Sequence, residues 1–339
     1  MDITMFREYQ VCSKCVMDTS DPSIEFDENG ICSHCHWYEQ RGIKQKSFAD
    51  LISKVEDIKL NQKNSNYDVI LGLSGGVDSS FLLYYCVVKL NLRPLVVHCD
   101  NGWNSEAAIH NIELLVKKLN LDLYTYIIDW EEFRELQRAF FYSDNIDLEM
   151  VTDHAMNAIQ QIVCEKFKIK YSVSGQNYQS ESILPRDWVH DKMDFSLIQK
   201  TAFNYGINDF KTYPYINKKL IDIEFISPLN HIDYNKEDAK KILNKFCDWK
   251  EYGGKHSESI FTKFYQNYIL PTKYNIDKRR AHLSSMIKAK QITRNEALQI
   301  LEKPIYDEVE LINDKKYVLK KLRLDEKWFN EYIKKEYDS

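Results

Sequence analysis

The sequence predicts an α/β protein, with a doubly wound parallel sheet between an N-terminal zinc ribbon and a helical C-terminal region. Short apolar segments alternate with helical periodicity between residues 67 and 226, which is typical of parallel strands joined by helices. Two Cys-x-x-Cys pairs precede this part of the chain. We therefore expect a ribbon and linking helix over 1–60, a sheet domain over 61–230 and a helical domain for substrate or partner contacts over 231–339.

Composition limits the possible functions. The net charge of −5 over 339 residues argues weakly against a large nucleic-acid surface. No N-terminal signal and no apolar run long enough to span a bilayer are visible, so we expect a cytoplasmic protein. In that compartment the eight cysteines are expected to be metal ligands or buried thiols rather than disulfides.

The first motif consists of two Cys-x-x-Cys pairs separated by 16 residues. Four thiolates at this spacing predict a closed, tetrahedral structural zinc site. A redox pair is the alternative for one Cys-x-x-Cys, and His34 or His36 could replace a cysteine ligand. A closed site has no open position, so we assign it to folding and not to catalysis. The expected ligands are Cys12, Cys15, Cys32 and Cys35, and residues 24–26 read as a strand of the ribbon.

The second motif is a glycine turn between an expected strand, residues 67–73, and an expected helix, residues 78–90. Glycines let backbone N–H groups approach a phosphate closely, and the helix dipole favours its negative charge. Asp78 suits this position if Mg2+ lies between it and the phosphate. The alternative is a strand–turn–helix corner without a ligand. The candidate phosphate-binding residues are Ser74, Gly75, Gly76, Ser79 and Ser80.

Polar residues follow two more expected strands, and carboxyl ends of parallel strands meet at one edge of a sheet. Residues 94–99 precede Asp100, which suits a ribose or Mg2+ or is simply a turn residue before Asn-Gly. Residues 169–174 precede Gly175, Gln176 and Asn177. Further strands are expected over 121–128 and 221–226. A helix is expected over 155–168, where Asp153 beside His154 could be the N-cap.

The C-terminal region shows helical patterns over 235–246, 259–270, 275–289 and 293–301, with a loop at Gly253-Gly254. One stretch gathers cations, which usually form a solvated face. Beside a triphosphate they would instead neutralise a departing pyrophosphate. The group comprises Lys273, Lys278, Arg279 and Arg280, with His282 nearby.

The glycine turn, Ser-Gly-Gly-Val-Asp-Ser-Ser, resembles the pyrophosphate loop of the ATP pyrophosphatase superfamily, which has the adenine nucleotide alpha hydrolase-like fold. That superfamily splits ATP into AMP and pyrophosphate. The wider set of motifs is similar to the N-acetyl sugar amidotransferases, which make acetamidino sugars for bacterial O-antigens or nonulosonic acids. The resemblance covers roughly 11–301 and rests on the ribbon, the loop, 152–154, 174–177, 181–185, Trp188, 261–264, 270–271, 277–284 and 293–294.

This resemblance implies an ATP-dependent reaction in which AMP is placed on the acetamido oxygen and ammonia then expels it. The implied cofactors are ATP, Mg2+ and structural Zn2+. Asp78 is implied for Mg2+, with Lys278 and Arg279 for pyrophosphate, and Asp100 and Gly175 for ATP. The residues implied for the sugar pocket or for ammonia are Asp153, His154, Gln176, Asn177, Glu181, Arg186 and Trp188.

The ammonia source is expected to be a separate protein. Asp2 occupies the position where an N-terminal-nucleophile glutaminase needs a cysteine, and no other segment resembles a glutaminase. The resemblance implies a partner paired as in the glutaminase and cyclase of imidazole glycerol phosphate synthase. Neither a membrane nor a nucleic-acid partner is expected.

Two alternatives remain open at this point. A tRNA thiolase or lysidine-forming enzyme uses the same loop, but it needs a broad basic surface and, for many thiolases, cysteines near the nucleotide. Cys164 and Cys247 are the candidates outside the ribbon and early core. A non-catalytic zinc-ribbon adaptor that only binds ATP is the other alternative.

Overall fold

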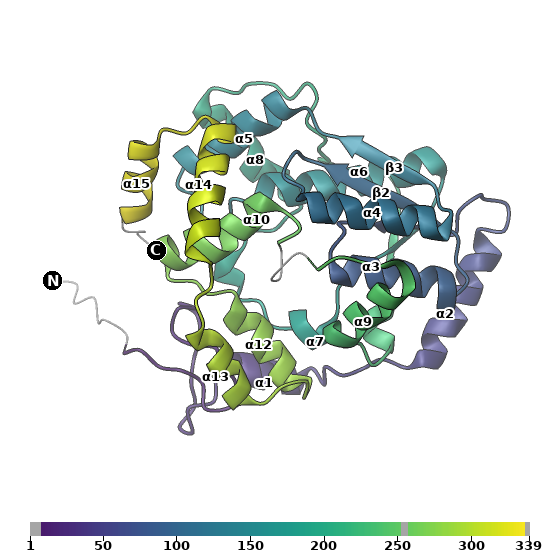
Figure 1. The fold of residues 1–339 in the computed structure, drawn as a ribbon, viewed down its shortest axis with the longest axis horizontal. Coiled ribbons are helices and arrows are strands. Elements are labelled where there is room, and N and C mark those ends of the chain that lie inside the picture. The colour runs from purple at the N-terminus through teal and green to yellow at the C-terminus, as the bar shows by residue number, and fades with distance from the viewer. Residues whose placement is uncertain (1–7, 252–256, 336–339) are drawn as a thin grey trace.

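The computed structural model describes residues 8–251 and 257–335, and its parallel sheet lies in the right half of the view in Figure 1, where β2 and β3 are labelled. Within this described part it has five strands in the order β3-β2-β1-β4-β5. Their bounds are β1 Val69–Gly72, β2 Pro94–Asp100, β3 Leu123–Ile127, β4 Tyr171–Val173 and β5 Glu224–Ile226. This order confirms the predicted doubly wound α/β fold.

The strand order reverses beside β1. Ile70 pairs with Leu95 of β2 on one side and with Ser172 of β4 on the other. The chain therefore leaves the carboxyl ends of β1 and β4 next to each other and turns toward opposite halves of the sheet. Open α/β sheets bind ligands in the crevice that forms at such a point.

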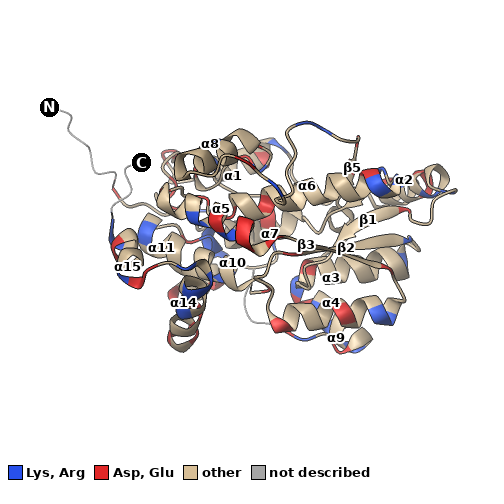
Figure 2. Cartoon of the chain, turned by 90° about the horizontal axis from the view of Figure 1, so that it is seen from above, with Lys and Arg blue, Asp and Glu red and all other residues tan. Residues whose placement is uncertain are grey.

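Helices cover both faces of the sheet. Val69, Leu71 and Val96 pack on one side in one hydrophobic cluster, whereas Ile70 and Leu95 point to the other side. The first cluster includes α2 Phe48–Asn61, α3 Val77–Tyr84, α4 Glu106–Leu119 and α9 Lys236–Cys247. The second includes α5 Trp130–Tyr142, α6 Met150–Phe167 and α8 Phe195–Tyr205. Figure 2 shows α6 on one side of the sheet and α3, α4 and α9 on the other.

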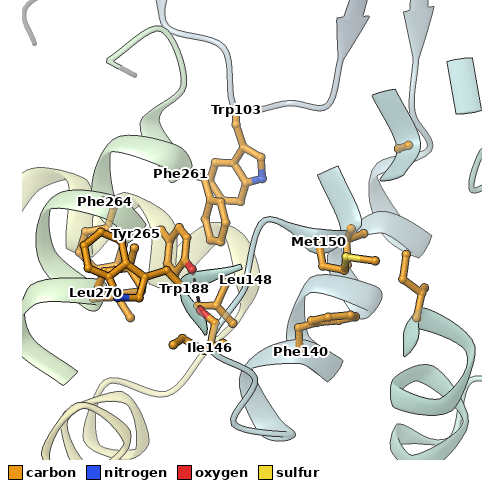
Figure 3. Packing of buried hydrophobic residues seen from close by; sticks show 14 of the residues in the cluster. Trp103, Phe140, Ile146, Leu148, Met150, Trp188, Phe261, Phe264, Tyr265 and Leu270 are labelled. Atoms are coloured by element: carbon orange, nitrogen blue, oxygen red, sulfur yellow. Dashed lines mark hydrogen bonds between the residues drawn. The ribbon is translucent and has the colours of Figure 1, made fainter. Parts of the chain in front are cut away.

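The helical C-terminal region packs into the second of these clusters. Trp103, in the loop after β2, stacks on Phe261 with ring centroids 5.2 Å apart. The Tyr265 hydroxyl donates to the Ile146 carbonyl at 2.6 Å (Figure 3). The helices here are α10 Ile260–Phe264, α11 Leu270–Tyr274, α12 Arg279–Lys288, α13 Arg294–Glu302, α14 Glu308–Leu322 and α15 Glu326–Lys334.

Short elements complete the chain. They are α1 Ser33–Gln40, α7 Tyr178–Glu181, the 3-10 turns Arg186–Trp188 and Pro228–His231, and π-helical turns over Tyr85–Lys89 and Tyr265–Ile269. No helix in the described residues is long and apolar enough to cross a membrane.

Three local expectations differ from the structure. Residues 24–26 form no regular strand, and the ribbon has only isolated bridges such as Phe26 with Cys32. α6 already begins at Met150, so Asp153 lies inside the helix and is not its N-cap. Asn275 has a left-handed φ of 55°, which ends α11, and the next helix begins only at Arg279. The expected Gly253-Gly254 loop lies outside the described residues.

The four-cysteine segment is attached to α12 and α13, which lie beside α1 in Figure 1. Arg294 donates to the carbonyls of Cys12 and Cys15 at 2.9–3.1 Å. The Val16 amide donates to Ser284 Oγ at 3.2 Å. A guanidinium that satisfies several carbonyls fixes both partners, so the N-terminal segment and the C-terminal helices stabilise each other.

We predict that Arg294→Ala lowers the free energy of unfolding by about 1–3 kcal/mol, because charge-assisted bonds to two carbonyls are lost. Denaturant unfolding measures this change. Lys316→Ala, on the exposed side of α14, is the matched control and should change stability little. An equal effect of the two substitutions would contradict the attachment.

Candidate active site

The loop after β1 brings backbone amides to one point. Gly75 has φ +80°, and a Cβ atom there would lie 2.3 Å from the Ala108 carbonyl oxygen of α4. The loop is held internally, with the hydroxyls of Ser74 and Ser79 3.1 Å apart and the Gly76 amide donating to Ser74 Oγ at 3.3 Å. No side chain caps α3, which begins directly after this loop. The geometry suits a phosphate.

The loop after β4 lies on the other side of the N-terminus of α3. A Cβ atom on Gly175 would lie 3.4 Å from the Asp78 carbonyl carbon and 3.5 Å from the Ser79 amide nitrogen. These are ordinary van der Waals distances, so the end of β4 lies directly beside the first turn of α3, and the close approach does not itself require glycine at this position. Both neighbouring strands thus end at this helix N-terminus.

Asp78 is held by two side chains that the sequence did not indicate. The Tyr234 hydroxyl donates to Asp78 Oδ1, and Lys236 Nζ lies 2.8 Å from Oδ2. Lys236 is the first residue of α9. The helix dipole disfavours a cation at that position, and this unfavourable placement was the only sign in the sequence that Lys236 has a partner elsewhere. Lys236 places a positive charge directly beside the loop.

Two other residues of the expected nucleotide site make structural contacts. Ser80 is fully buried, and its hydroxyl accepts from Trp249 Nε1 at 3.2 Å. Asp100 Oδ1 accepts from the Gly102 amide at 2.9 Å, as the turn alternative described. The hydroxyl of Ser80 thus points into the core, while Asp100 shapes the loop after β2.

A cavity of about 410 Å³ opens beside Ser74. It brings together residues that are far apart in the sequence, because α6, α7, α10 and α12 all contribute side chains. The residues that sequence reasoning had singled out are Ser74, Asp153, Gln176, Glu181, Lys278 and His282. Those it missed include Asn104, Glu149, Lys192 and Gln266, whereas Thr262 belongs to the motif 261–264 on which the resemblance rests.

Several other candidates lie in the core. The His154 ring stacks on Phe195, its Nδ1 lies 3.0 Å from the Lys192 carbonyl, and its Nε2 accepts from the Ile216 amide at 3.3 Å. Burial lowers the pKa of His154. Trp188 is fully buried, and Asn177 caps α7 by accepting from the Ser180 amide at 3.0 Å. These three residues support the walls of the site.

The C-terminal cations are divided among different places. Lys278 and His282 line the cavity. Arg279 pairs with Asp277 at 2.7 Å and donates to carbonyls at the end of α13. The remaining cations also lie elsewhere: Arg280 binds Asp18, Lys273 binds the Tyr332 carbonyl, and Arg186 lines a separate cavity beside the ribbon.

The cavity contains both signs of charge at short range. Glu149 is buried, accepts from Gln266 Nε2 at 2.8 Å and lies 4.0 Å from Lys278 Nζ. Burial raises the pKa of Glu149, although Lys278 opposes this shift. Lys192 lies 3.0 Å from Asp153 and 2.5 Å from Asp147; these acids outweigh burial and raise the pKa of Lys192. Such a lining suits a polar ligand.

The four cysteines form a separate buried cluster. Their Sγ atoms all lie within 4.8 Å of one another, with Cys12–Cys35 at 3.9 Å and Cys15–Cys32 at 3.6 Å. Zinc–sulfur bonds of about 2.3 Å place the corners of a tetrahedron about 3.8 Å apart. Backbone amides of Lys14, Cys15, Met17 and Cys32 donate to these sulfurs. The donor set fits a single tetrahedral metal ion.

Comparison with known families yields two matches. Residues 258–339 match the model of the C-terminal domain of WbpG-like lipopolysaccharide biosynthesis proteins. Residues 50–173 match the model of NAD synthase. No curated protein matches the chain.

Solved structures show distant likeness. An ammonia-dependent NAD synthetase from Campylobacter jejuni is 16% identical over 87% of this chain and 99% of its own, with TM-score 0.38. The U34-tRNA thiolase NcsA from Methanococcus maripaludis is 15% identical over 86% and 88%, with TM-score 0.33. The NMN synthetase from Francisella tularensis is 15% identical over 65% and 91%, with TM-score 0.31. At these scores the likenesses carry no inference about function.

We predict that Gly75→Ala weakens ATP binding by tenfold or more, about 1.4 kcal/mol, because its methyl group would collide with the Ala108 carbonyl. Titration calorimetry measures the affinity. Gly42→Ala is the control, since Gly42 also has a positive φ but has no atom within 4 Å of its would-be Cβ. Unchanged ATP affinity in Gly75→Ala would argue against phosphate binding at this loop.

We predict that Cys32→Ser releases the bound metal and lowers the free energy of unfolding by several kcal/mol, because structural metal sites contribute about 10 kcal/mol or more of binding energy. Elemental analysis and thermal unfolding measure the two effects. Cys99→Ser, outside the cluster, should retain the metal. Full metal content in Cys32→Ser would exclude a four-thiolate site.

Proposed function

We propose a reaction for this chain from the premise that it belongs to an amidotransferase-like pyrophosphate-loop family of glycan biosynthesis. The chain replaces the acetamido oxygen of an N-acetyl sugar with nitrogen from ammonia and converts ATP into AMP and pyrophosphate. The substrate is a nucleotide-linked sugar or a nonulosonic acid. The product is an acetamidino sugar.

One observation carries this proposal: both matched regions line the same cavity. Ser74 and Asn104 come from the region that matches NAD synthase, whereas Thr262, Lys278 and His282 come from the WbpG-like region. A nucleotide-binding loop and a glycan-associated helical module therefore face one chamber. This arrangement supports group transfer between a bound nucleotide and a sugar.

The chemistry explains why ATP is required. An amide carbonyl is a poor electrophile, and its oxygen is a poor leaving group. The acetamido oxygen attacks the α-phosphorus, and pyrophosphate leaves. Ammonia then attacks the carbonyl carbon, and AMP departs with the oxygen. The enzyme supplies alignment of the reactants and stabilisation of phosphate charge.

The chain's own residues divide these tasks. The amides of Gly75 and Gly76 and the hydroxyls of Ser74 and Ser79 hold phosphate oxygens. Asp78 would hold Mg2+, which would offset phosphate charge when bound. Lys236, now paired with Asp78 at 2.8 Å, would then be available for the pyrophosphate, together with Lys278 from the cavity. Arg279 remains with Asp277 in this assignment.

The cavity supplies the sugar pocket. Asp153, Gln176 and Glu181 provide polar groups on its walls, where hydroxyl groups of a sugar would find partners. The apolar side chains of Met156, Ile183, Leu184 and Val189 provide a surface for the acetamido methyl group. Zn2+ in the cysteine cluster would stabilise the ribbon against α12 and α13.

The two cysteines named for the thiolase alternative are buried in the core. Cys164 is fully buried, and burial raises its pKa to about 12. Cys247 is also buried, with a raised pKa, and its thiol donates to the Leu243 carbonyl. Neither thiol is poised to become the thiolate that persulfide chemistry needs. Replacing each by serine should therefore leave the reaction intact.

The ammonia supply and the cellular location complete the proposal. We propose a separate glutaminase partner that delivers ammonia, paired as in imidazole glycerol phosphate synthase. The reaction with activated sugars would take place in the cytoplasm. In vitro, an ammonium salt replaces the partner.

The test uses the purified chain with ATP, Mg2+, an ammonium salt and a panel of acetamido sugars carrying 18O in the acetamido group. We predict that AMP and pyrophosphate form in equal amounts and that the 18O label appears in AMP, because the sugar oxygen leaves on the α-phosphate. Accumulation of ADP, or AMP without label, would contradict the reaction.

A matched pair of variants tests the loop. Asp78→Asn should reduce AMP formation by roughly 10²–10³, since a charge that aligns the phosphates is lost. Asp222→Asn removes an exposed acid that is paired with Lys219 on the surface, and it should leave the rate unchanged. Equal rates in the two variants would remove Asp78 from the mechanism.

A further inference from the structure

Glu149 is a buried acid in the cavity that the reaction above does not use. It lies at the N-cap position of α6 and is 8% exposed. Gln266, from the π-helical turn between α10 and α11, donates to its Oε2 at 2.8 Å. π-helical turns occur frequently at functional sites, because they move one side chain out of the ordinary helical register.

The surroundings of Glu149 favour transfer of a proton rather than permanent ion pairing. Lys278 Nζ lies 4.0 Å away, beyond hydrogen-bonding distance, and the hydrogen-bond partners of Glu149 are neutral, the Gln266 amide and the Thr262 hydroxyl. Asp153, by contrast, pairs with Lys192 at 3.0 Å, and its side chain is 37% exposed. Glu149 is therefore a buried carboxylate on the cavity wall, and among the described residues no cation lies within hydrogen-bonding distance of it.

The position of Glu149 relative to the glycine loop completes the geometry. Glu149 and Ser74 line the same cavity, together with Thr262, Asn104 and Lys278. A group held between the loop and α6 is thus open to both the nucleotide and this carboxylate. Burial also raises the pKa of Glu149 toward the range in which an acid works best as a proton acceptor.

We propose that Glu149 is the general base that accepts the proton lost by ammonia as it attacks the adenylated acetamido carbon. This inference rests on the proposed function and assigns its second step.

The balance of that step is simple. The nitrogen lone pair forms the new C–N bond, and the attacking nitrogen becomes positively charged. The C–O bond to AMP breaks with its electron pair on the AMP oxygen. One proton passes from the nitrogen to the Glu149 carboxylate, leaving the product as an amidinium ion. No oxidant or further reactant is needed.

The test separates the two half-reactions in Glu149→Gln, which has the same shape and keeps an oxygen for Gln266. Sugar-dependent exchange of pyrophosphate into ATP reports adenylation, and mass spectrometry of the sugar reports amidine formation. We expect exchange within about threefold of wild type and amidine formation lower by roughly 10²–10⁴, the usual contribution of a general base. Loss of both together, with folding intact, would assign Glu149 to adenylation instead.

Hydroxylamine provides a rescue. Its conjugate acid is a much stronger acid than ammonium, so its adduct gives up the proton to water without a protein base. Glu149→Gln should therefore form the N-hydroxyamidine at a rate close to that of wild type. Failure of this rescue while exchange persists would overturn the role of Glu149 as a base.

Two further variants test whether the effect is specific to the Glu149 carboxylate. Asp144→Asn removes an acid paired with Lys273 at 3.2 Å, outside the cavity lining, and should leave both half-reactions unchanged. Glu149→Asp keeps a carboxylate but shortens the side chain, and should retain part of the amidine formation.

If wild type shows no sugar-dependent exchange, the proposed function fails. If exchange is normal and Glu149→Gln makes amidine at full rate, only the role of Glu149 fails.

Discussion

The close approach of three backbone segments at the N-terminus of α3 is the constraint on which the site depends. Gly75 passes so close to the Ala108 carbonyl that no side chain fits there, and Gly175 lies in van der Waals contact with the backbone of Asp78. The parallel sheet imposes this meeting, because β1 and β4 are neighbours and the chain leaves both at the same edge. A geometry that suits a phosphate thus follows from the strand order together with Gly75.

Around this point, the rest of the chain determines what can reach the nucleotide. The loop after β2 carries Trp103, which packs on Phe261, so the C-terminal helices are held against the edge of the sheet that carries the loop. On the opposite side of these helices, Arg294 of α13 binds the four-cysteine segment through the Cys15 carbonyl. Lys278 and His282 lie on α12 or at its start and face the cavity. The described part of the four-cysteine segment therefore stabilises the C-terminal helices that line the cavity, but it contributes no side chain to the lining itself.

Much of this architecture could be predicted from the sequence, since it depends on local patterns. The strands, the glycine loop and the paired cysteines each have signals within a few residues. The rest of the architecture depends on the direction in which each side chain points, which residue type does not reveal. Residues 273–282 form one cationic cluster in the sequence, but the turn at Asn275 and the helical rotation after it point its members to different neighbours.

Contacts between residues that are far apart in the sequence explain why sequence reasoning missed other residues of the site. Glu149 precedes a helix and has no distinguishing signal in the sequence, and Lys236 begins one, where its unfavourable position in the helix dipole is only a weak signal. Only tertiary packing encloses the first within the cavity and brings the second to Asp78. In the same way, the bonds of Arg279 to the carbonyls of Ile300 and Lys303 and the burial of Trp188 could not be deduced from residue type alone.

The hydrophobic cluster shared by the sheet and the C-terminal helices has an evolutionary consequence. Phe261, Phe264 and Tyr265 belong to the same cluster as Ile70 and Leu95 of the central strands. The two matched regions are therefore not independent cassettes that recombination could exchange freely. A lineage that acquired a different C-terminal module would need compensating aromatic residues in the loop after β2, so the cavity lining should change by point substitution rather than by module shuffling.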